Sequence, residues 1–568
     1  MKIRELSIYL EKLEKTSSRI EITKILADLF KKSSKDEIDK IVYLLLGSLA
    51  PRYEGVVFNL ADRMMVKVIT SAYKKDPKEV TTLYKKIGDL GGVAEGLAKD
   101  AGGQGNEEVA GVYDKLAKIA NDQGSESQER KIDSMASLLS KLDPLSVRFV
   151  VRIPIGNLRL GFSDKTIIDA LSWMEAGDKS AKDEIEEAYQ VMPDVGAISK
   201  LVKAVGIGDL AKRIKPTPGI PIMPMLAQRL SSPDEMIKKM VKVSVEPKFD
   251  GLRVLIHFDR GKIKAYTRNL NEISSMFTEL ANLSKYLKAK SAILDSEAVG
   301  LDPKTKKMVN FQTTMQRRRK HDITKTAGNI PLKFQLFDLI YKNGESFMDR
   351  PYTDRRVELA RTITPNGTFV VDENILTDDP QVIRAEHKKQ LAKGLEGVIV
   401  KKADSKYVPG RTGWRWVKMK EVEGTQGKLA DTIDCVIMGY TQGKGKRAQF
   451  GIGQFLAAVA DGDVFKTVTK VGTGLTDEQF RELNKRLAKI KVKEKPKEYE
   501  VHKDLNPDFW VRPEVVVELA ADEITKSPKH TAGLALRFPR LVKFRDDKSP
   551  SEASTTKELD RLFKIQKN

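Results

Sequence analysis

The residues best suited to chemistry lie in the segment Val243–Arg253, which reads Val-Ser-Val-Glu-Pro-Lys-Phe-Asp-Gly-Leu-Arg. Val243 and Val245 alternate with polar residues, as in a half-buried strand, and Pro247 favours the end of that strand. Lys248 is therefore expected to project from a rigid element. A lysine flanked by arginines is a candidate nucleophile, because attack requires the neutral amine and nearby positive charge disfavours the ammonium form.

Two arginines follow this lysine at positions suited to binding phosphate. Arg253 comes directly after Gly251 and Leu252, and Arg268 ends a predicted hairpin that turns at Arg260-Gly261. Guanidinium groups hold phosphate oxygens in forked hydrogen bonds. The alternative is that Lys248 is an ordinary solvated lysine, as most lysines are, but the pattern Lys-x-Asp-Gly-x-Arg favours a functional role.

Further candidate side chains lie on four predicted strands downstream. Residues 292–299 alternate so that Asp295 and Glu297 share a face, and residues 333–341 carry Phe337. Each of these residues alone has a purely structural interpretation as a strand-face carboxylate or a core ring. The remaining two strands, 396–402 and 414–420, supply Glu396 and the same-face residues Trp416, Lys418 and Lys420.

The composition limits the class of protein. A chain of 568 residues suffices for three or four domains, and 40% hydrophobic with 32% charged residues fits a globular protein. Cys435 is the one cysteine, which excludes a disulfide framework and a multi-cysteine zinc site. No apolar run is long enough for a membrane span, and the first residues lack the apolar core of a secretory signal, so a cytoplasmic protein is expected.

The net charge of +21 indicates a polyanionic partner. Enrichment in lysine and glutamate for stability at high temperature is the alternative, but such proteins need not be strongly basic. We therefore favour a nucleic acid as the partner.

The order of predicted elements divides the chain into three parts. Residues 1 to about 210 have the spacing of amphipathic helices, and the proline-rich stretch 215–224 is typical of a domain boundary. An α+β region follows. After residue 421 come short predicted strands at 432–440, 454–460, 464–471 and 515–520, with a hairpin turn at Asp461-Gly462, which favour a small OB-fold barrel, and residues 551–567 predict a terminal helix.

One loop of the helical part could bind phosphate. The stretch Ile155–Phe162 is bracketed by glycines, and Ser163 is placed to cap the helix that follows. Backbone amides, a helix N-terminus, Asn157 and Arg159 together would suit a DNA phosphate, with an ordinary capped turn as the alternative.

Taken in order, these motifs resemble those of the covalent nucleotidyltransferases, the polynucleotide ligases and mRNA capping enzymes. Over essentially its whole length the chain resembles an ATP-dependent DNA ligase of the archaeal and eukaryotic replicative type. The resemblance implies an all-helical DNA-binding domain (1–215), an α+β adenylation domain (216–420) and an OB-fold domain with a C-terminal helix (421–568). It also implies sealing of nicks in double-stranded DNA, during replication, repair and recombination, with ATP and Mg²⁺ or Mn²⁺, by a monomer.

The resemblance also implies a role for each candidate residue. Lys248 would become adenylated, Glu246 would accept a hydrogen bond from the adenine amino group, and Phe337 would stack on adenine. The remaining ATP-binding residues would be Arg253 and Arg268 at ribose and phosphates, Lys418, Lys420 and Arg411 at the α-phosphate, Arg537 to Lys548 at the β- and γ-phosphates, and Glu297 and Glu396 at the metal.

Three other classes of protein share part of these features. An RNA ligase or capping guanylyltransferase shares the lysine chemistry but has no need of a long helical region. An NAD-dependent ligase would carry a four-cysteine zinc module, and a non-catalytic clamp would not need Lys248 and the paired glutamates. No glutamine-plus-aromatic peptide for a sliding clamp stands out, so recruitment by such a clamp stays open.

Overall fold

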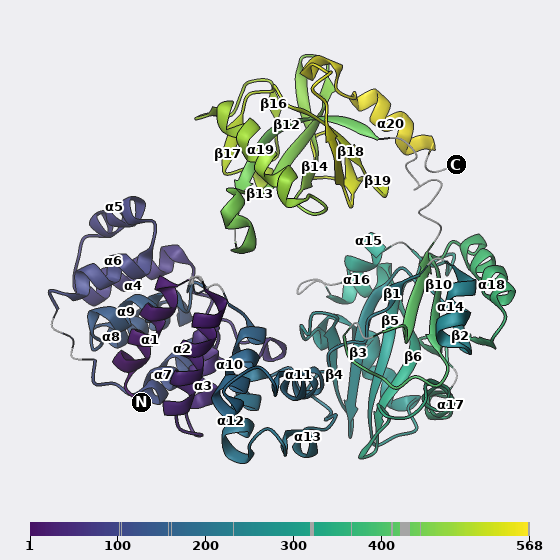
Figure 1. Cartoon of the computed structure of the whole chain (residues 1–568), viewed down its shortest axis with the longest axis horizontal. Coiled ribbons are helices and arrows are strands. Elements are labelled where there is room, and N and C mark those ends of the chain that lie inside the picture. The colour runs from purple at the N-terminus through teal and green to yellow at the C-terminus, as the bar shows by residue number, and fades with distance from the viewer. Residues whose placement is uncertain are drawn as a thin grey trace. The chain divides into compact units, whose positions relative to one another are not determined.

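The chain folds into two compact units, Met1–Lys420 and Glu421–Asn568, each described here by itself (Figure 1). The structure is a computed structural model, and it describes all residues except 17, 102, 104, 157, 159, 161, 231, 310, 318–322, 365, 411–412, 421–431, 444 and 566–568. Asn157, Arg159 and Arg411, three of the predicted site residues, therefore lie outside the described residues. Within the described part, no helix is long and apolar enough to cross a membrane.

The first unit begins with a helical region, as the spacing of apolar residues predicts. The apolar residues on one face of each helix, such as Leu6 and Leu10 or Leu26 and Phe30, are buried in one continuous core. The helices are α1 (Ile3–Lys15), α2 (Arg19–Lys32), α3 (Ile38–Leu45), α4 (Asp62–Tyr73), α5 (Pro77–Ile87), α6 (Leu90–Ala98), α7 (Val109–Asn121), α8 (Ser127–Leu139), α9 (Pro144–Arg152), α10 (Asp164–Ala176), α11 (Lys182–Val191), α12 (Val195–Val205) and α13 (Leu210–Arg213).

The predicted cap of α10 is corrected by the structure. Ser163 is the residue that precedes the helix, but its side chain makes no capping hydrogen bond. The Asp164 carboxylate instead accepts a hydrogen bond from the Tyr189 hydroxyl at 2.7 Å, which ties α10 to α11.

The rest of the first unit contains two sheets whose strands are mostly antiparallel (Figure 1). One sheet has the order β1 (Gln228–Arg229), β11 (Trp416–Lys420), β10 (Gly397–Lys402), β2 (Val243–Pro247), β9 (Ile375–Thr377). The other has the order β4 (Lys262–Thr267), β3 (Leu252–Asp259), β5 (Ser291–Gly300), β6 (Leu332–Lys342), β7 (Glu345–Ser346), with β8 (Phe369–Val371) beside β6. The main accompanying helices are α14 (Pro233–Met240), α17 (Tyr352–Thr362) and α18 (Pro380–Ala392); the short helices α15 (Phe311–Met315) and α16 (Ile323–Asn329) lie between β5 and β6 in the chain.

The chain passes from the first of these sheets to the second immediately after Lys248. β2 ends at Pro247 and β3 begins at Leu252, so the four residues between them join the two sheets. Gly251 allows this close passage, because a Cβ atom there would lie 2.5 Å from the carbonyl oxygen of Ala298 on β5. Lys248 is thereby placed where side chains of both sheets converge.

The second unit is an OB-fold, a small strand-rich domain around its own core (Figure 1). The turn at Asp461-Gly462 joins β13 to β14 as predicted, with Asp461 opposite Val464. The strands are β12 (Ile433–Gln442), β13 (Ile452–Asp461), β14 (Val464–Val471), β15 (Lys491–Val492), β16 (Tyr499–Glu500), β17 (Phe509–Val511), β18 (Val516–Ala520), β19 (Glu523–Lys526), β20 (Leu534–Arg537) and β21 (Arg540–Phe544), and the helices are α19 (Asp477–Lys489) and α20 (Thr556–Ile565).

Candidate active site

A pocket lies around Lys248 in the first unit, lined by residues from both sheets. It brings together five of the predicted site residues: Glu246, Lys248, Arg253, Glu297 and Phe337. Its full lining is Ala227, Glu246, Pro247, Lys248, Phe249, Arg253, Glu297, Phe337, Asp372, Ile399, Lys401 and Trp416.

The charged partner of Lys248 is a carboxylate. Its Nζ contacts Oε2 of Glu396, and the backbones of the two segments are joined by hydrogen bonds from Lys248 N–H to the Gly397 carbonyl (2.9 Å) and from Glu396 N–H to the Lys248 carbonyl (3.1 Å). Arg253 lines the same pocket, but the side chain in direct contact with the amine is this carboxylate. The ion pair has to open before the amine can attack an electrophile, since attack needs the neutral form.

Arg253 is held by an acid that the sequence placed near the site without a role. Its Nε donates to Asp295 Oδ1 at 3.0 Å and its Nη2 to Oδ2 at 2.5 Å, while Nη1 donates to the Met225 carbonyl. Asp295 is 1% exposed and also accepts from the Tyr407 hydroxyl at 2.9 Å. The forked hydrogen bonds that were predicted between the Arg253 guanidinium group and phosphate are therefore made with Asp295. This contact fixes the guanidinium group at the pocket wall.

Glu246 lines the pocket and is 1% exposed. Lys401 Nζ lies 2.5 Å from its Oε2, and the Tyr352 hydroxyl and Ser244 Oγ donate to its Oε1. A buried carboxylate of this kind is stable only when paired and hydrogen-bonded. These partners hold Glu246 as a hydrogen-bond acceptor in the lining of the pocket.

Aromatic rings form another part of the wall. The rings of Phe337 and Trp416 meet edge to face with centroids 6.0 Å apart, and Lys401 Nζ lies 4.5 and 4.4 Å from their centres. Phe337 is half-buried, so part of its ring remains available to a planar ligand.

Glu297 on β5 lies opposite Arg253 on β3. Burial raises the pKa of Glu297 to about 7, although the charges of Lys248 and Arg253 act in the opposite direction. The negative charges of Asp295 and Glu396 contribute to the increase. The carboxyl group is therefore poised between its two protonation states near neutral pH.

We expect the pKa of Glu297 to make stability depend on pH. The folded state binds this proton more tightly than the unfolded state, so the free energy of unfolding should fall as pH rises from the unfolded value near 4.5 to about 7. Replacement by glutamine should remove that decrease, as measured by urea unfolding between about pH 5 and 8. Glu373→Gln, at a carboxylate 79% exposed, is the control; equal pH profiles for wild type and Glu297→Gln would contradict the assignment.

The two glutamates also suit a divalent cation. Glu297 and Glu396 interact electrostatically with each other beside Lys248, and two neighbouring carboxylates without a cation between them repel. Carboxylate oxygens are the ligands that hard cations such as Mg²⁺ take. The donor set therefore fits the metal that the sequence predicted.

The remaining predicted residues of the first unit lie on or beside these strands. Lys418 is half-buried on β11, opposite Ile399 of β10, and Lys420 ends the same strand opposite Gly397. Arg268 is exposed in the turn directly after β4. Neither Lys418 nor Arg268 is among the residues that line the pocket.

The predicted cations of the second unit are engaged by carboxylates of that unit. Arg537 Nη1 lies 2.6 Å from Glu523 Oε1, and Lys548 Nζ lies 2.7 Å from Asp434 Oδ2. Arg545, between them in sequence, also pairs with Asp434 at 2.9 Å. Contacts of these residues with a phosphate would have to replace these ion pairs.

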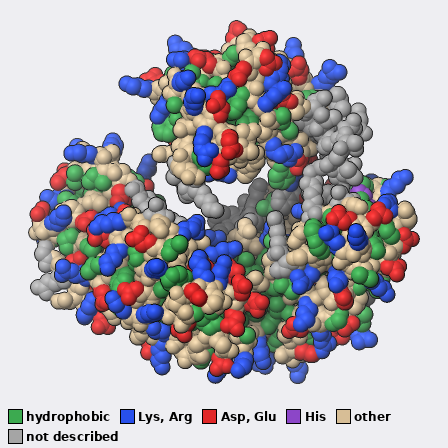
Figure 2. Space-filling view, viewed as in Figure 1, with side chains coloured by type: hydrophobic (Ala, Val, Ile, Leu, Met, Phe, Trp, Pro, Cys, Tyr) green, Lys and Arg blue, Asp and Glu red, His purple; other side chains and the backbone are tan. Residues whose placement is uncertain are grey.

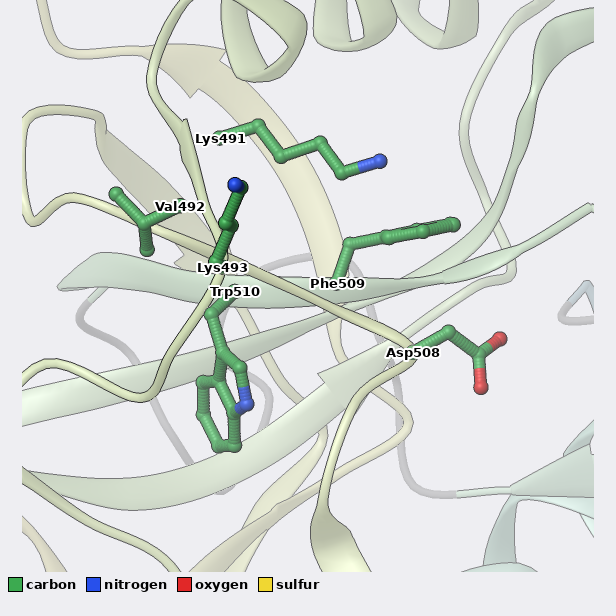
Figure 3. Close-up of a pocket in the computed structure, with 6 residues that line it drawn as sticks. All are labelled: Lys491, Val492, Lys493, Asp508, Phe509 and Trp510. Carbon is green, nitrogen blue, oxygen red and sulfur yellow. The ribbon is translucent and has the colours of Figure 1, made fainter.

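A second pocket lies on the OB-fold, between β15 and β17 (Figure 3). Lys491 lies alongside the Phe509 ring with Nζ 3.5 Å from the ring centre, and Lys493 is exposed beside it. Asp508 accepts a hydrogen bond from the Gln442 N–H at 2.8 Å. Among the described residues, no carboxylate forms an ion pair with Lys491 or Lys493, so the surface presents two uncompensated positive charges. Other basic side chains are scattered among carboxylates on the visible face of the molecule (Figure 2).

Three residues of the lysine pocket or its wall were not predicted from the sequence: Lys401, Tyr352 and Asp372. Lys401 lies five residues after Glu396 within a strand that was predicted. Its neighbours Val400 and Lys402 gave no reason to single it out. The position of a lysine inside an apolar strand could have indicated a buried ion pair, since such a lysine needs a buried partner.

A helical region, an α+β region with a pocket around a lysine, and an OB-fold, in this order, are the architecture of a polynucleotide ligase. Three family models match the chain: "DNA ligase N terminus" over residues 2–172, "ATP dependent DNA ligase domain" over 224–420 and "ATP dependent DNA ligase C terminal region" over 448–548.

Whole-length relatives agree with these matches. The chain is 40% identical over 575 residues to a "Probable DNA ligase" of Dictyoglomus turgidum (99% of this chain, 97% of that one) and 38% identical over 592 residues to a "DNA ligase" of Saccharolobus solfataricus (100% and 98%). A solved structure described as "Pmar-Lig_PreS3" has the same fold, with a TM-score of 0.53 and 19% identity, over 95% of this chain and 99% of that one. The chain belongs to the ATP-dependent DNA ligase family.

Proposed function

We propose that this protein seals nicks in double-stranded DNA, joining a 3′-hydroxyl to a 5′-phosphate with ATP, and that it acts as a monomer in replication, repair and recombination. The observation that carries the proposal is the position of Lys248 between two sheets, in contact with Glu396 and in one pocket with Glu246, Glu297 and Phe337. Separate apolar cores in the helical region, the α+β region and the OB-fold support domains 1–215, 216–420 and 421–568.

The first step is attack by the neutral amine of Lys248 on the α-phosphorus of ATP. A P–N bond forms, pyrophosphate leaves, and the lysine carries AMP. Phe337 and Glu246 would hold the adenine, and Arg253 the ribose. Negative charge develops on the phosphoryl oxygens, so the cations Lys418, Lys420 and Arg411 would have to stand near the α-phosphate before the reaction.

Two further transfers complete the reaction. AMP passes from Lys248 to the 5′-phosphate at the nick, and the 3′-hydroxyl then displaces AMP to form the phosphodiester bond. Glu297 and Glu396 would hold a Mg²⁺ or Mn²⁺ ion, which supplies a positive charge to the phosphates when bound. Arg537 and Lys548 would meet the β- and γ-phosphates, and Asn157 with Arg159 a DNA phosphate.

Incubation with radiolabelled ATP or GTP, followed by addition of nicked DNA or nicked RNA, tests the proposal. We expect transfer of AMP from ATP to the protein and sealing of the DNA nick. Transfer of GMP instead would favour a capping guanylyltransferase, and sealing of RNA alone an RNA ligase.

The lysine surface of the OB-fold, defined by Lys491 and Lys493, is expected to contact the DNA backbone. Each phosphate neutralised contributes about −0.9 to the slope of log affinity against log salt concentration. Replacing both lysines with alanine should therefore weaken binding of nicked duplex at low salt and reduce the steepness of that slope by up to about 2. Fluorescence anisotropy across a salt series measures both quantities.

A charge-matched control separates contact from net charge. Lys529 and Lys564 are exposed in the same unit and pair with Asp504 and Asp560. The double alanine variant at these positions removes the same charge and should leave the slope near the wild-type value. Equal slopes for both double variants would show that the lysine surface does not contact the backbone.

A further inference from the structure

The reaction described above gives Glu246 a role at the adenine but gives none to Lys401, its partner in a buried ion pair. Both side chains are 2% exposed, and the charged atoms lie 2.5 Å apart in the lining of the pocket. Removing two charges from water is costly, so a pair buried at this depth requires further hydrogen bonds to be stable. The contacts of the two groups show what the pair does.

The two carboxylate oxygens of Glu246 have different partners. Oε1 accepts hydrogen bonds from the Tyr352 hydroxyl and from Ser244 Oγ (3.1 Å), and Oε2 forms the ion pair with Lys401. An ionised carboxylate offers about four lone-pair positions. Among the described residues no donor other than the Lys401 ammonium contacts Oε2, and Glu246 lines the pocket, so its carboxylate keeps an acceptor position for a ligand.

The donors of Lys401 are all directed at protein atoms. Its Nζ lies 2.5 Å from Glu246 Oε2, 3.2 Å from the Tyr352 hydroxyl and 3.5 Å from the Phe337 carbonyl oxygen. An ammonium group has three N–H donors. Lys401 therefore has none left for a nucleotide and acts through Glu246.

Other charged groups around Glu246 are paired with each other. Arg356, on α17, pairs with Asp372, which directly follows β8: Arg356 Nη1 lies 2.5 Å from Asp372 Oδ1. Lys401 is thus the cation in contact with Glu246, and Tyr352 and Ser244 are neutral donors.

We propose that Lys401 is a positioning residue that holds the Glu246 carboxylate in place with an acceptor open to the base, so that the pocket selects a nucleobase presenting an amino group over one presenting a carbonyl at the same place. The inference rests on the proposed function, because it concerns the nucleotide used there. An amino group donates to the open lone pair. A carbonyl oxygen would face the carboxylate with no hydrogen between them, which leaves both acceptors buried and unsatisfied.

Without Lys401, the carboxylate of Glu246 would lose the cation that fixes its position. A carboxylate that can turn away from the base no longer holds an acceptor against a carbonyl oxygen, so a carbonyl-bearing base would be rejected less strongly. Loss of Lys401 should therefore change which base is chosen, in addition to the affinity for nucleotide.

The test compares adenylation of the full-length protein by ATP with modification by inosine triphosphate, which carries a carbonyl in place of the amino group. Initial rates at several nucleotide concentrations give kcat/KM for each. We expect wild type to prefer ATP by at least about 100-fold and Lys401→Met to prefer it by less than about 10-fold. Lys401→Arg, which keeps the cation, should restore most of the preference.

Lys402→Met is the matched control. Lys402 is the neighbouring residue of β10 and pairs with Asp404 on the surface, so its loss should leave the preference unchanged. Purine riboside triphosphate, which lacks a group at that position, provides a third probe. Wild type should discriminate against it, and Lys401→Met should treat it nearly as it treats ATP.

A folded Lys401→Met variant with the wild-type preference would overturn the proposal. If that variant does not fold, Tyr352→Phe removes another donor to Glu246 and should reduce the preference, and an unchanged preference there overturns the proposal equally. Wild-type protein that uses both nucleotides equally defeats this inference alone, whereas wild type that forms no adduct with either defeats the proposed function.

Discussion

Replacing Lys248 with alanine is expected to abolish formation of the protein–AMP adduct, with a loss of at least about 10⁴-fold in the rate of adenylation. The amine is the atom to which AMP would be bonded, and no neighbouring group in the pocket can take its place: Lys401 is 2% exposed and its donors are committed to Glu246, Tyr352 and the Phe337 carbonyl. Mass spectrometry of the intact protein after incubation with ATP and Mg²⁺ measures the adduct directly.

A control variant and a pre-adenylated substrate show whether the loss is specific to the first step. Lys406→Ala removes a lysine that is 61% exposed and paired with Asp349, and this variant should be adenylated at the wild-type rate. A nicked duplex that already carries AMP on its 5′-phosphate bypasses the first two steps, so Lys248→Ala should still seal it at a measurable rate. An AMP adduct on Lys248→Ala would show that another residue is the nucleophile.

Replacing Asp338 with alanine is expected to lower the free energy of unfolding of the first unit by about 3–5 kcal/mol. Asp338 and Arg355 are both 0% exposed and form two hydrogen bonds, Nε–Oδ1 at 2.8 Å and Nη2–Oδ2 at 3.0 Å. Removing the carboxylate leaves a buried guanidinium without its counterion. Urea unfolding followed by circular dichroism measures the change.

The same pair connects the pocket to the core. Asp338 follows Phe337 on β6, and Arg355 lies one turn after Tyr352 on α17, so the pair joins the two elements that carry the Phe337 ring and the Tyr352 hydroxyl, which donates to Glu246. The double variant Asp338→Leu/Arg355→Met removes both charges and should recover much of the lost stability. Arg361→Ala, at an arginine 73% exposed, is the control. A cost below about 1 kcal/mol for Asp338→Ala would show that the pair contributes little.

The local elements of the OB-fold follow closely from sequence because their signals are local. The strand predicted at 464–471 is β14, and the Asp-Gly turn before it joins β13 to β14. Alternation of apolar and polar residues and the conformational preference of glycine act within a few residues. The cap predicted at Ser163 was wrong, because its side chain makes no capping hydrogen bond. The hydrogen bond from the Tyr189 hydroxyl to Asp164 at the start of α10 is a tertiary contact, which the local sequence does not show.

The sequence by itself determined the candidate residues for the chemistry of this protein: the motif around Lys248, the strand-face glutamates Glu297 and Glu396, and Phe337. Residue type and period-two spacing were sufficient, because both depend on the chain near each residue. The tertiary structure alone decided the partners: Glu396 for Lys248, Asp295 for Arg253 and Lys401 for Glu246. Alternation shows which face a side chain takes, but which strands become neighbours depends on pairing between distant segments, and β2 and β3 prove to belong to different sheets.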